Sequence, residues 1–255
     1  MFSDHFSCVS SAYAEFRPRY PDSLFRWLGE LPGGRDLAWD CATGSGQAAI
    51  ALAFLFERVI ATDASAEQIA AATPHPRVDY RVAPAEVSGI QSESVDLVTV
   101  AQALHWLDRP AFFAEARRVL RSNGVIAAWT YGNPRLDDPR ADQALQRFTS
   151  QAVGPYWPPE RALVDSEYRT IDFPFAEIEP PAFEMEAQWT LTALLGYIGT
   201  WSATTRFRAA KAYDPLPELA AGLQGFWGDP ETPRRIEWPL ALRVGRREAP
   251  REVSQ

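Results

Sequence analysis

Residues 37–49 read LAWDCATGSGQAA, and this stretch decides the fold class. Its apolar start is typical of a buried strand, and the glycine-rich turn Thr43–Gly46 follows almost at once. Such a turn between a strand and a helix lets a ligand approach the backbone closely, as in nucleotide-binding α/β proteins. The spacing of Gly44, Gly46 and Ala49 also fits the GxGxxA pattern of dinucleotide sites, so the glycines alone leave the ligand open.

Short apolar runs alternate with helical patterns over the first half of the chain. Ser65 and Gln68 have the spacing of a capping box that starts a helix. Strands are expected at 36–41, 58–63, 78–83, 95–101 and 125–131, and helices at 48–57, from Ser65 to Pro74, and from Pro110 to a stop at Ser122-Asn123-Gly124. This order predicts an α/β fold with a doubly wound, mostly parallel sheet, in which ligands bind along the carboxyl ends of the strands.

The composition changes after Gly132, because 14 of the 21 prolines lie from Pro134 onward. We expect a helical, proline-rich lid inserted after the fifth strand, with a late strand at 182–190 and a helix at 191–203. A last sheet strand is expected at 235–245. The expected domains are an N-terminal cover plus cofactor-binding core (1–132), a lid that binds substrate (133–234), and the final strand with a C-terminal tail (235–255).

Composition narrows the function classes. A net charge of −8 argues against a nucleic-acid partner, which would need a basic face. The two cysteines, Cys8 and Cys41, lack a CxxC spacing and neighbouring histidines, so no metal site or disulfide framework is expected. No apolar run approaches the roughly 18 residues of a membrane span, and no signal-peptide pattern opens the chain, so we expect a cytoplasmic location without membrane partners. The oligomeric state stays open.

Two carboxylates bear on the identity of the ligand. Asp63 follows Gly44 at the spacing at which an acidic residue binds a ribose hydroxyl, in dinucleotide and S-adenosylmethionine sites alike. Asp40 precedes the turn, where its charge would repel a pyrophosphate and attract an ammonium or sulfonium group. The alternatives are that Asp40 only caps backbone amides of the turn and that Asp63 is only a helix-entry carboxylate.

These residues carry a resemblance. Asp40–Gly46 resembles the DxGxGxG-type first motif of class I S-adenosylmethionine-dependent methyltransferases, with Ala42 where the first glycine usually stands. The likeness extends to the methyltransferase type 11 group, in its branch of trans-aconitate-methyltransferase-like enzymes. The blocks that carry it are AYAEFRPRYP (12–21), ATDAS (61–65), VAPAE (82–86), VDLVTVAQALHWLD (95–108), RRVLRSNGVIAAW (117–129), FPF (173–175), GYIGTWSA (196–203) and IEWPLALRVG (236–245).

The resemblance implies a Rossmann-like methyltransferase sheet that binds S-adenosylmethionine, and it implies roles for matched positions. Asp63 would hold the ribose hydroxyls. Ala64 would lie on the adenine, Ala85 and Glu86 along its edge, Gln102 and Ala103 under the methionine portion, and Tyr13 and Arg17 over the aminoacid end, beside the turn residues Asp40, Ala42, Gly44, Ser45 and Gly46. Pro84 stands where many relatives have an aspartate. For Arg17 the alternative is a surface arginine lying against Tyr20.

His105 is the one candidate base, because an imidazole titrates near neutrality. Its alternative role is to bond a backbone carbonyl and shape the pocket wall. Trp106 could face the sulfonium, or serve as pocket wall. Further candidates to line the substrate pocket are Tyr156, Trp157, Trp201 and Arg206, and each of them also fits ordinary lid core.

The expected activity is methyl transfer to a small molecule, with a carboxylic acid as the first candidate, bound by Arg17, Arg19 or Arg206. The stretch AQALHW replaces the Asn/Asp-Pro-Pro-aromatic motif that is common in enzymes methylating base or glutamine amino groups. Two other functions remain open: an NAD(P)-dependent oxidoreductase, and a non-catalytic protein that binds the cofactor.

Overall fold

The computed structural model describes residues 17–248, so the predicted cofactor residue Tyr13 lies outside the described residues. The chain forms two compact units. We call residues 20–131, 163–183 and 240–248 the sheet unit, and residues 17–19, 132–162 and 184–239 the insertion unit. Residues 163–183 group with the sheet unit, although the expected lid at 133–234 contains them.

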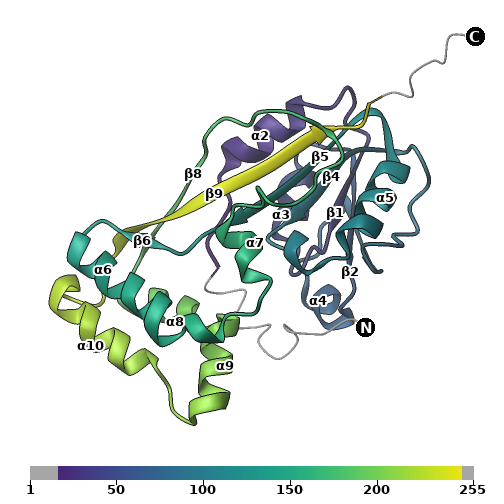
Figure 1. The fold of residues 1–255 in the computed structure, drawn as a ribbon. Helices are drawn as coiled ribbons and strands as arrows, with labels where there is room; N and C mark the ends of the chain where they lie inside the picture. Colours follow the sequence, from purple (N-terminus) through teal and green to yellow (C-terminus); the bar gives the residue numbers. More distant parts are fainter. Residues whose placement is uncertain (1–16, 249–255) are drawn as a thin grey trace, which may run out of the picture. The chain divides into compact units, whose positions relative to one another are not determined.

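Five parallel strands form the centre of the sheet unit, in the order β3-β2-β1-β4-β5. Figure 1 labels β1, β2, β4 and β5. Beside β5 runs β9, which is antiparallel to it, with Tyr131 opposite Leu240. The strand bounds are β1 (Leu37–Cys41), β2 (Arg58–Asp63), β3 (Val78–Val82), β4 (Val95–Ala101), β5 (Leu120–Tyr131), β7 (Ala176–Glu177) and β9 (Arg234–Arg246). The expected α/β fold with a mostly parallel sheet is confirmed.

Helices cover both faces of this sheet. On one face, Phe112 packs against Trp39, with ring centroids 6.0 Å apart. On the other face, Phe25 packs against Trp129 at 6.1 Å. Both tryptophans are fully buried, so each face has an aromatic core of its own. The helices are α2 (Asp22–Glu30), α3 (Gln47–Ala53), α4 (Ala66–Ala71), the 3₁₀ turn η2 (Leu104–Trp106), α5 (Arg109–Val119) and α7 (Arg161–Asp165).

Three predicted helix ends are wrong. The helix expected at 48–57 ends at Ala53, because the chain turns there to enter β2. Ser122-Asn123-Gly124 lies inside β5 and does not stop α5; Leu120 is already extended and pairs with Val95. The helix expected at 191–203 is two helices, because Trp201 adopts an extended conformation between them.

The insertion unit combines short helices with a small antiparallel sheet. Trp189 of β8 pairs with Arg234 of β9, and Glu184 pairs with Pro239. The elements are β6 (Arg135–Leu136), α6 (Pro139–Arg147), the π-helical turn η3 (Phe148–Ala152), the 3₁₀ turn η4 (Gly154–Tyr156), β8 (Glu184–Trp189), α8 (Leu191–Gly199), α9 (Ser202–Lys211) and α10 (Leu216–Trp227). None of the helices between residues 17 and 248 has both the length and the apolar character that crossing a bilayer requires.

Candidate cofactor and catalytic site

The glycine-rich turn leaves the carboxyl end of β1 and starts α3. Ala42, Gly44 and Gly46 all have a left-handed backbone, with φ of 53°, 56° and 87°. Gly46 also lies against Tyr80 of β3, because a Cβ added at Gly46 would meet the Tyr80 Cζ at 3.0 Å and its hydroxyl closer still. The Tyr80 hydroxyl donates a hydrogen bond to the Thr73 carbonyl. Glycine at position 46 is therefore required by the protein itself, before any ligand is considered.

Asp40 is buried at the start of this turn. Its Oδ2 accepts a hydrogen bond from the Thr43 hydroxyl at 2.5 Å, and its Oδ1 accepts one from the Thr99 hydroxyl at 2.7 Å. Burial raises the pKa of Asp40 from 3.8 to about 6, against the opposing effect of hydrogen bonds from Thr43, Thr99 and the Ala49 backbone. Asp40 therefore binds the turn through the Thr43 hydroxyl, whereas its alternative role was to cap backbone amides of the turn, and burial disfavours its ionised form.

Asp63 connects the end of β2 to the turn. Its Oδ2 accepts a hydrogen bond from the Gly44 N–H, and its Oδ1 accepts one from the Ser65 N–H, both at 2.9 Å. The second bond is the helix-entry role considered as an alternative. It also replaces half of the expected capping box, because the Ser65 hydroxyl accepts from the Gln68 N–H while the Ser65 N–H goes to Asp63.

The predicted cofactor carboxylates converge on one place. Burial and the charges of Asp40, Glu86 and Asp63 together raise the pKa of the Cys41 thiol. Among the described residues, the partners of Asp40 are two hydroxyls and a backbone group, with no cationic side chain. A buried acid with a second acid, Asp63, near it is compensated well by a cationic ligand and poorly by a pyrophosphate. The site therefore fits a cofactor with a sulfonium or ammonium group.

The remaining predicted cofactor residues lie at the ends of the neighbouring strands. Ala64 follows β2, and Ser45 lies in the turn, where its carbonyl accepts from the Thr73 N–H. Ala85 is buried, and Glu86 Oε1 accepts a hydrogen bond from the Asp108 N–H at 3.3 Å. Arg17 belongs to the insertion unit. The cofactor roles of all these residues stay predictions.

Gln102 directly follows β4 and is turned toward β5. Its φ is 56°, a left-handed conformation that is uncommon for a residue other than glycine. Its Oε1 accepts hydrogen bonds from the Thr130 hydroxyl and the Tyr131 N–H, and its Nε2 donates to the Tyr131 carbonyl. The side-chain amide is thus bound to β5. The predicted role of Gln102 and the buried Ala103 below the methionine portion would therefore rest on their backbone and aliphatic surface.

His105 and Trp106 lie on η2 at the same end of the sheet. His105 is buried, and the two rings are 4.8 Å apart. His105 Nδ1 lies 2.8 Å from the hydroxyl of Tyr168, which is fully buried. The sequence offered no orienting partner for His105, and the structure supplies one. Tyr168 had no signal in the sequence, because it comes from an irregular segment 63 residues further on.

The other predicted substrate residues belong to the insertion unit, where they form ring contacts. Trp157 and Trp201 have centroids 5.5 Å apart, and Tyr156 packs on Phe207 at 5.1 Å. Arg206 is exposed on α9. Trp201 is buried, as its alternative role in the lid core requires, while Tyr156 and Trp157 are half-buried.

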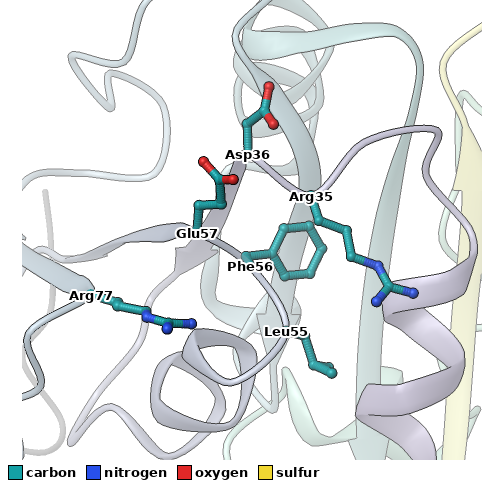
Figure 2. Close-up of a pocket in the computed structure, with 6 residues that line it drawn as sticks. All are labelled: Arg35, Asp36, Leu55, Phe56, Glu57 and Arg77. Atoms are coloured by element: carbon teal, nitrogen blue, oxygen red, sulfur yellow. The ribbon is translucent and has the colours of Figure 1, made fainter.

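A cavity of about 500 Å³ lies at the opposite edge of the parallel strands. Figure 2 shows its lining residues, which directly precede β1, β2 or β3: Arg35, Asp36, Leu55, Phe56, Glu57 and Arg77. The two arginines are tied to backbone carbonyls, Arg35 to Gly29 and Arg77 to Ala53. The predicted cofactor residues of the sheet unit lie at the carboxyl ends of the strands, so this cavity is separate from them. No cluster of metal-ligating side chains occurs within residues 17–248.

Comparison with known proteins assigns the family. Residues 39–128 match the family model described as a methyltransferase domain. A Dictyostelium discoideum protein that bears the name methyltransferase is 36% identical over 221 residues, which cover 86% of this chain and 84% of that protein. The solved structure of a protein from Anaeromyxobacter dehalogenans, titled as a type II methyltransferase, is 51% identical, with a TM-score of 0.87 over 92% of this chain and all of that one.

The fold extends to more distant proteins. The YcgJ protein of Bacillus subtilis is 14% identical, with a TM-score of 0.52 over 90% of this chain and 98% of that one, and so shares the fold alone. The chain belongs to the methyltransferase-domain family and is a class I S-adenosylmethionine-dependent methyltransferase. This assignment decides against the oxidoreductase and the non-catalytic alternatives.

Proposed function

We propose that this enzyme transfers a methyl group from S-adenosylmethionine to a small-molecule acceptor, with carboxylic acids as the first class to test. The observation that carries the cofactor is the buried Asp40, whose partners among the described residues include no cation. The acidic net charge of −8 and the AQALHW stretch after β4 favour a small acceptor over nucleic acid or protein glutamine.

Each part of the site contributes by binding and orientation. S-adenosylmethionine, when bound, supplies a methyl group already activated on a sulfonium. Asp40 would offset the cofactor's positive charge, Asp63 would accept hydrogen bonds from the ribose hydroxyls, and the turn from Ala42 to Gly46 would leave room for the aminoacid tail. Orientation of two reactants in this way can supply roughly 7–11 kcal/mol of the barrier.

The class of acceptor decides whether a base is needed. A carboxylate acceptor is already deprotonated at neutral pH and needs none. A hydroxyl or amine acceptor must lose a proton, and His105, at the carboxyl end of β4, is the imidazole placed to receive it. We propose His105 for that role with protic acceptors.

Calorimetry and a transfer assay test the proposal together. S-adenosylmethionine and its demethylated product should both give binding heats, and NAD should give none. Incubation with methyl-labelled cofactor and a panel of acids, alcohols and amines should then label at least one acceptor. Binding of NAD without binding of S-adenosylmethionine would overturn the cofactor assignment. Labelling of RNA or protein, with no small molecule labelled, would overturn the acceptor class.

Replacing the ribose-binding carboxylate gives a sharper test of the site. Asp63→Ala should weaken S-adenosylmethionine binding by about 1–3 kcal/mol, because it leaves hydrogen-bonding partners unmet. The matched control is Asp79→Ala on β3, since Asp79 is an exposed carboxylate paired with Arg58 and Arg81. Calorimetry should show unchanged affinity for the control. Equal S-adenosylmethionine affinities of the two variants would mean that Asp63 does not bind the ribose.

A further inference from the structure

The segment between β3 and β4 carries the predicted adenine residues Ala85 and Glu86. It begins beside the predicted ribose carboxylate, because the Ala83 N–H donates to the backbone carbonyl of Asp63 at 3.0 Å. An adenine joined to a ribose at Asp63 would therefore lie near this segment. Whatever fixes the segment in place then also determines how the base is held.

Residues 84–87 form a turn, which we call the adenine turn, since the Val87 N–H donates to the Pro84 carbonyl at 3.2 Å. The start of α5 contacts this turn, because Glu86 Oε1 accepts from the N–H of Asp108, the residue that caps α5. That hydrogen bond is long, at 3.3 Å, and exposed to solvent. It therefore contributes little to holding the turn in place.

A stronger attachment follows directly after the turn, at the buried Ser88. Oε1 of Glu115, on α5, accepts hydrogen bonds from the Ser88 N–H at 2.8 Å and from the Ser88 hydroxyl at 2.6 Å. Only 8% of Glu115 is exposed, and hydrogen bonds from Arg118 and Ser88 lower its pKa from 4.5 to about 2. The carboxylate is thus ionised at neutral pH and binds the chain where it leaves the adenine turn.

Arg118, one turn further along α5, completes this attachment. Its Nε donates to Glu115 Oε2 and its Nη2 to Glu115 Oε1, both at 2.7 Å. The same guanidinium donates to the Ile90 carbonyl at 2.7 Å and to the Ser92 hydroxyl at 2.9 Å. Removing a carboxylate from water is costly, and apolar side chains of similar volume often stabilise a fold equally well. What the carboxylate of Glu115 adds is a fixed position for Ser88.

We infer that Glu115 is a positioning residue for the adenine of the cofactor and acts by fixing the adenine turn through Ser88. This inference rests on the proposed S-adenosylmethionine site with its ribose at Asp63. Among the described residues, the hydrogen-bond partners of the carboxylate are Ser88 and Arg118, so Glu115 acts on the base through the turn. Loss of this acceptor releases Ser88, and the turn that precedes it then shifts relative to the base.

Selectivity between two bases tests the inference. S-adenosylhomocysteine and S-inosylhomocysteine differ only in the purine ring, where inosine has a carbonyl in place of the amino group and a protonated N1. Calorimetry on the wild type should show tighter binding of the adenosine ligand. Glu115→Gln keeps the size of the side chain but exchanges one acceptor oxygen for an amide group that can only donate. It should therefore lower the ratio of the two affinities roughly tenfold.

The affinity ratio separates positioning from general damage to the fold. Partial unfolding weakens the binding of both ligands by the same factor, since only folded protein binds them, and so leaves the ratio unchanged. The matched control is Glu93→Gln, because Glu93 lies on the same segment beyond the adenine turn and pairs with Arg247 at 2.6 Å. The control should keep the wild-type ratio. A wild-type ratio in Glu115→Gln, or an equal loss in the control, would overturn the inference.

Ser88→Ala provides a second route if Glu115→Gln does not fold. It removes the hydroxyl and leaves the N–H, so the affinity ratio should fall roughly threefold, and an unchanged ratio would again overturn the inference. Where both variants fold, their losses should not add in the double variant, because both weaken one attachment. Full additivity would mean that Glu115 does not act through Ser88.

Failure of the proposed function gives a different result. If the wild type binds neither ligand, the proposed S-adenosylmethionine site is wrong. If the wild type binds S-adenosylhomocysteine but does not discriminate against the inosine ligand, or discriminates no better than Glu115→Gln, only the positioning role of Glu115 fails. The two failures are therefore distinguishable.

Discussion

Ala42 carries a backbone cost that a glycine would avoid. It opens the turn after β1 with φ of 53°, a conformation that costs an L-residue about 1–2 kcal/mol relative to the right-handed region. The sequence already marks this position, since the first motif of the resemblance usually has glycine there. A small side chain is tolerated because Ala42 lies only partly buried beside the main core.

Replacing this alanine with glycine should leave the stability of the protein unchanged or increase it slightly. Ala42→Gly should change the free energy of unfolding by between zero and about 1 kcal/mol in the stabilising direction, because relief of strain offsets the added entropy of the unfolded chain. The matched control is Ala51→Gly inside α3, which should lose about 1 kcal/mol. Urea denaturation of both variants measures the difference. Equal losses at the two positions would show that Ala42 is unstrained.

Sequence reasoning found the charged residues of the site and missed those that orient them. Asp40 and Asp63 are visible because they flank a glycine turn at a telling spacing. The hydroxyl partner Thr99 becomes visible only once β1 and β4 are paired, since the register places it opposite Asp40. Tyr168 lies in an irregular segment and belongs to no pattern, so only the folded chain brings it to His105.

At the scale of elements, the glycine turn and β3 constrain each other. Gly46 is the residue that precedes α3, and Tyr80 of β3 fills the space above it. Gly44 shares the left-handed backbone and has room for a methyl group, since the atom nearest to an added Cβ is Gln68 Oε1 at 3.8 Å. Comparing alanine substitutions at the two glycines therefore distinguishes the cost of backbone strain from the cost of steric contact.

A double-mutant cycle tests that separation. Gly46→Ala should cost about 2–4 kcal/mol, from strain plus overpacking against Tyr80. Tyr80→Phe alone should cost about 1 kcal/mol through the lost bond to the Thr73 carbonyl. The double variant should be about 1 kcal/mol more stable than the sum, because the phenol oxygen no longer meets the new methyl group. Gly44→Ala should cost only about 1–2 kcal/mol and add independently to Tyr80→Phe. If the costs of Gly46→Ala and Tyr80→Phe simply add, the contact between the new methyl group and the phenol oxygen must be relieved by a shift elsewhere in the chain.

The limits of prediction differ between kinds of element. Strands 58–63 and 95–101 have the predicted bounds, because buried parallel strands are short apolar runs with clear ends. Ser122-Asn123-Gly124 shows the opposite case. The three residues favour a helix stop by local chemistry, yet β5 already pairs with β4 at Leu120. The register then skips residues 121–124, where Asn123 takes its left-handed conformation, and resumes at Val125. Sheet pairing, which is tertiary, overrides the local signal there.

At the scale of the whole molecule, Asp40 couples folding to cofactor binding. Its pKa is raised from 3.8 to about 6, so the folded cofactor-free protein binds this proton more tightly than the unfolded chain does. Stability is then highest below the unfolded pKa and falls as pH rises through the folded one, by about 3 kcal/mol in total. A bound cation reverses the preference, since it favours the ionised carboxylate.

Two opposite pH dependences should result, one for folding and one for binding. Between pH 4 and 7, the unfolding free energy of the wild type minus that of Asp40→Asn should fall by about 2.5 kcal/mol, most of the total, because only the wild type acquires a buried charge. Taking the difference between the two proteins cancels the carboxylates that they share. Over the same range, S-adenosylmethionine affinity of the wild type should rise up to about pH 6 and then level off, while that of Asp40→Asn stays flat. Urea titrations and calorimetry at each pH measure the two quantities on the same samples. A stability difference that does not change with pH would mean that Asp40 keeps an ordinary pKa, and an affinity that rises equally in both proteins would place the cofactor's charge away from Asp40.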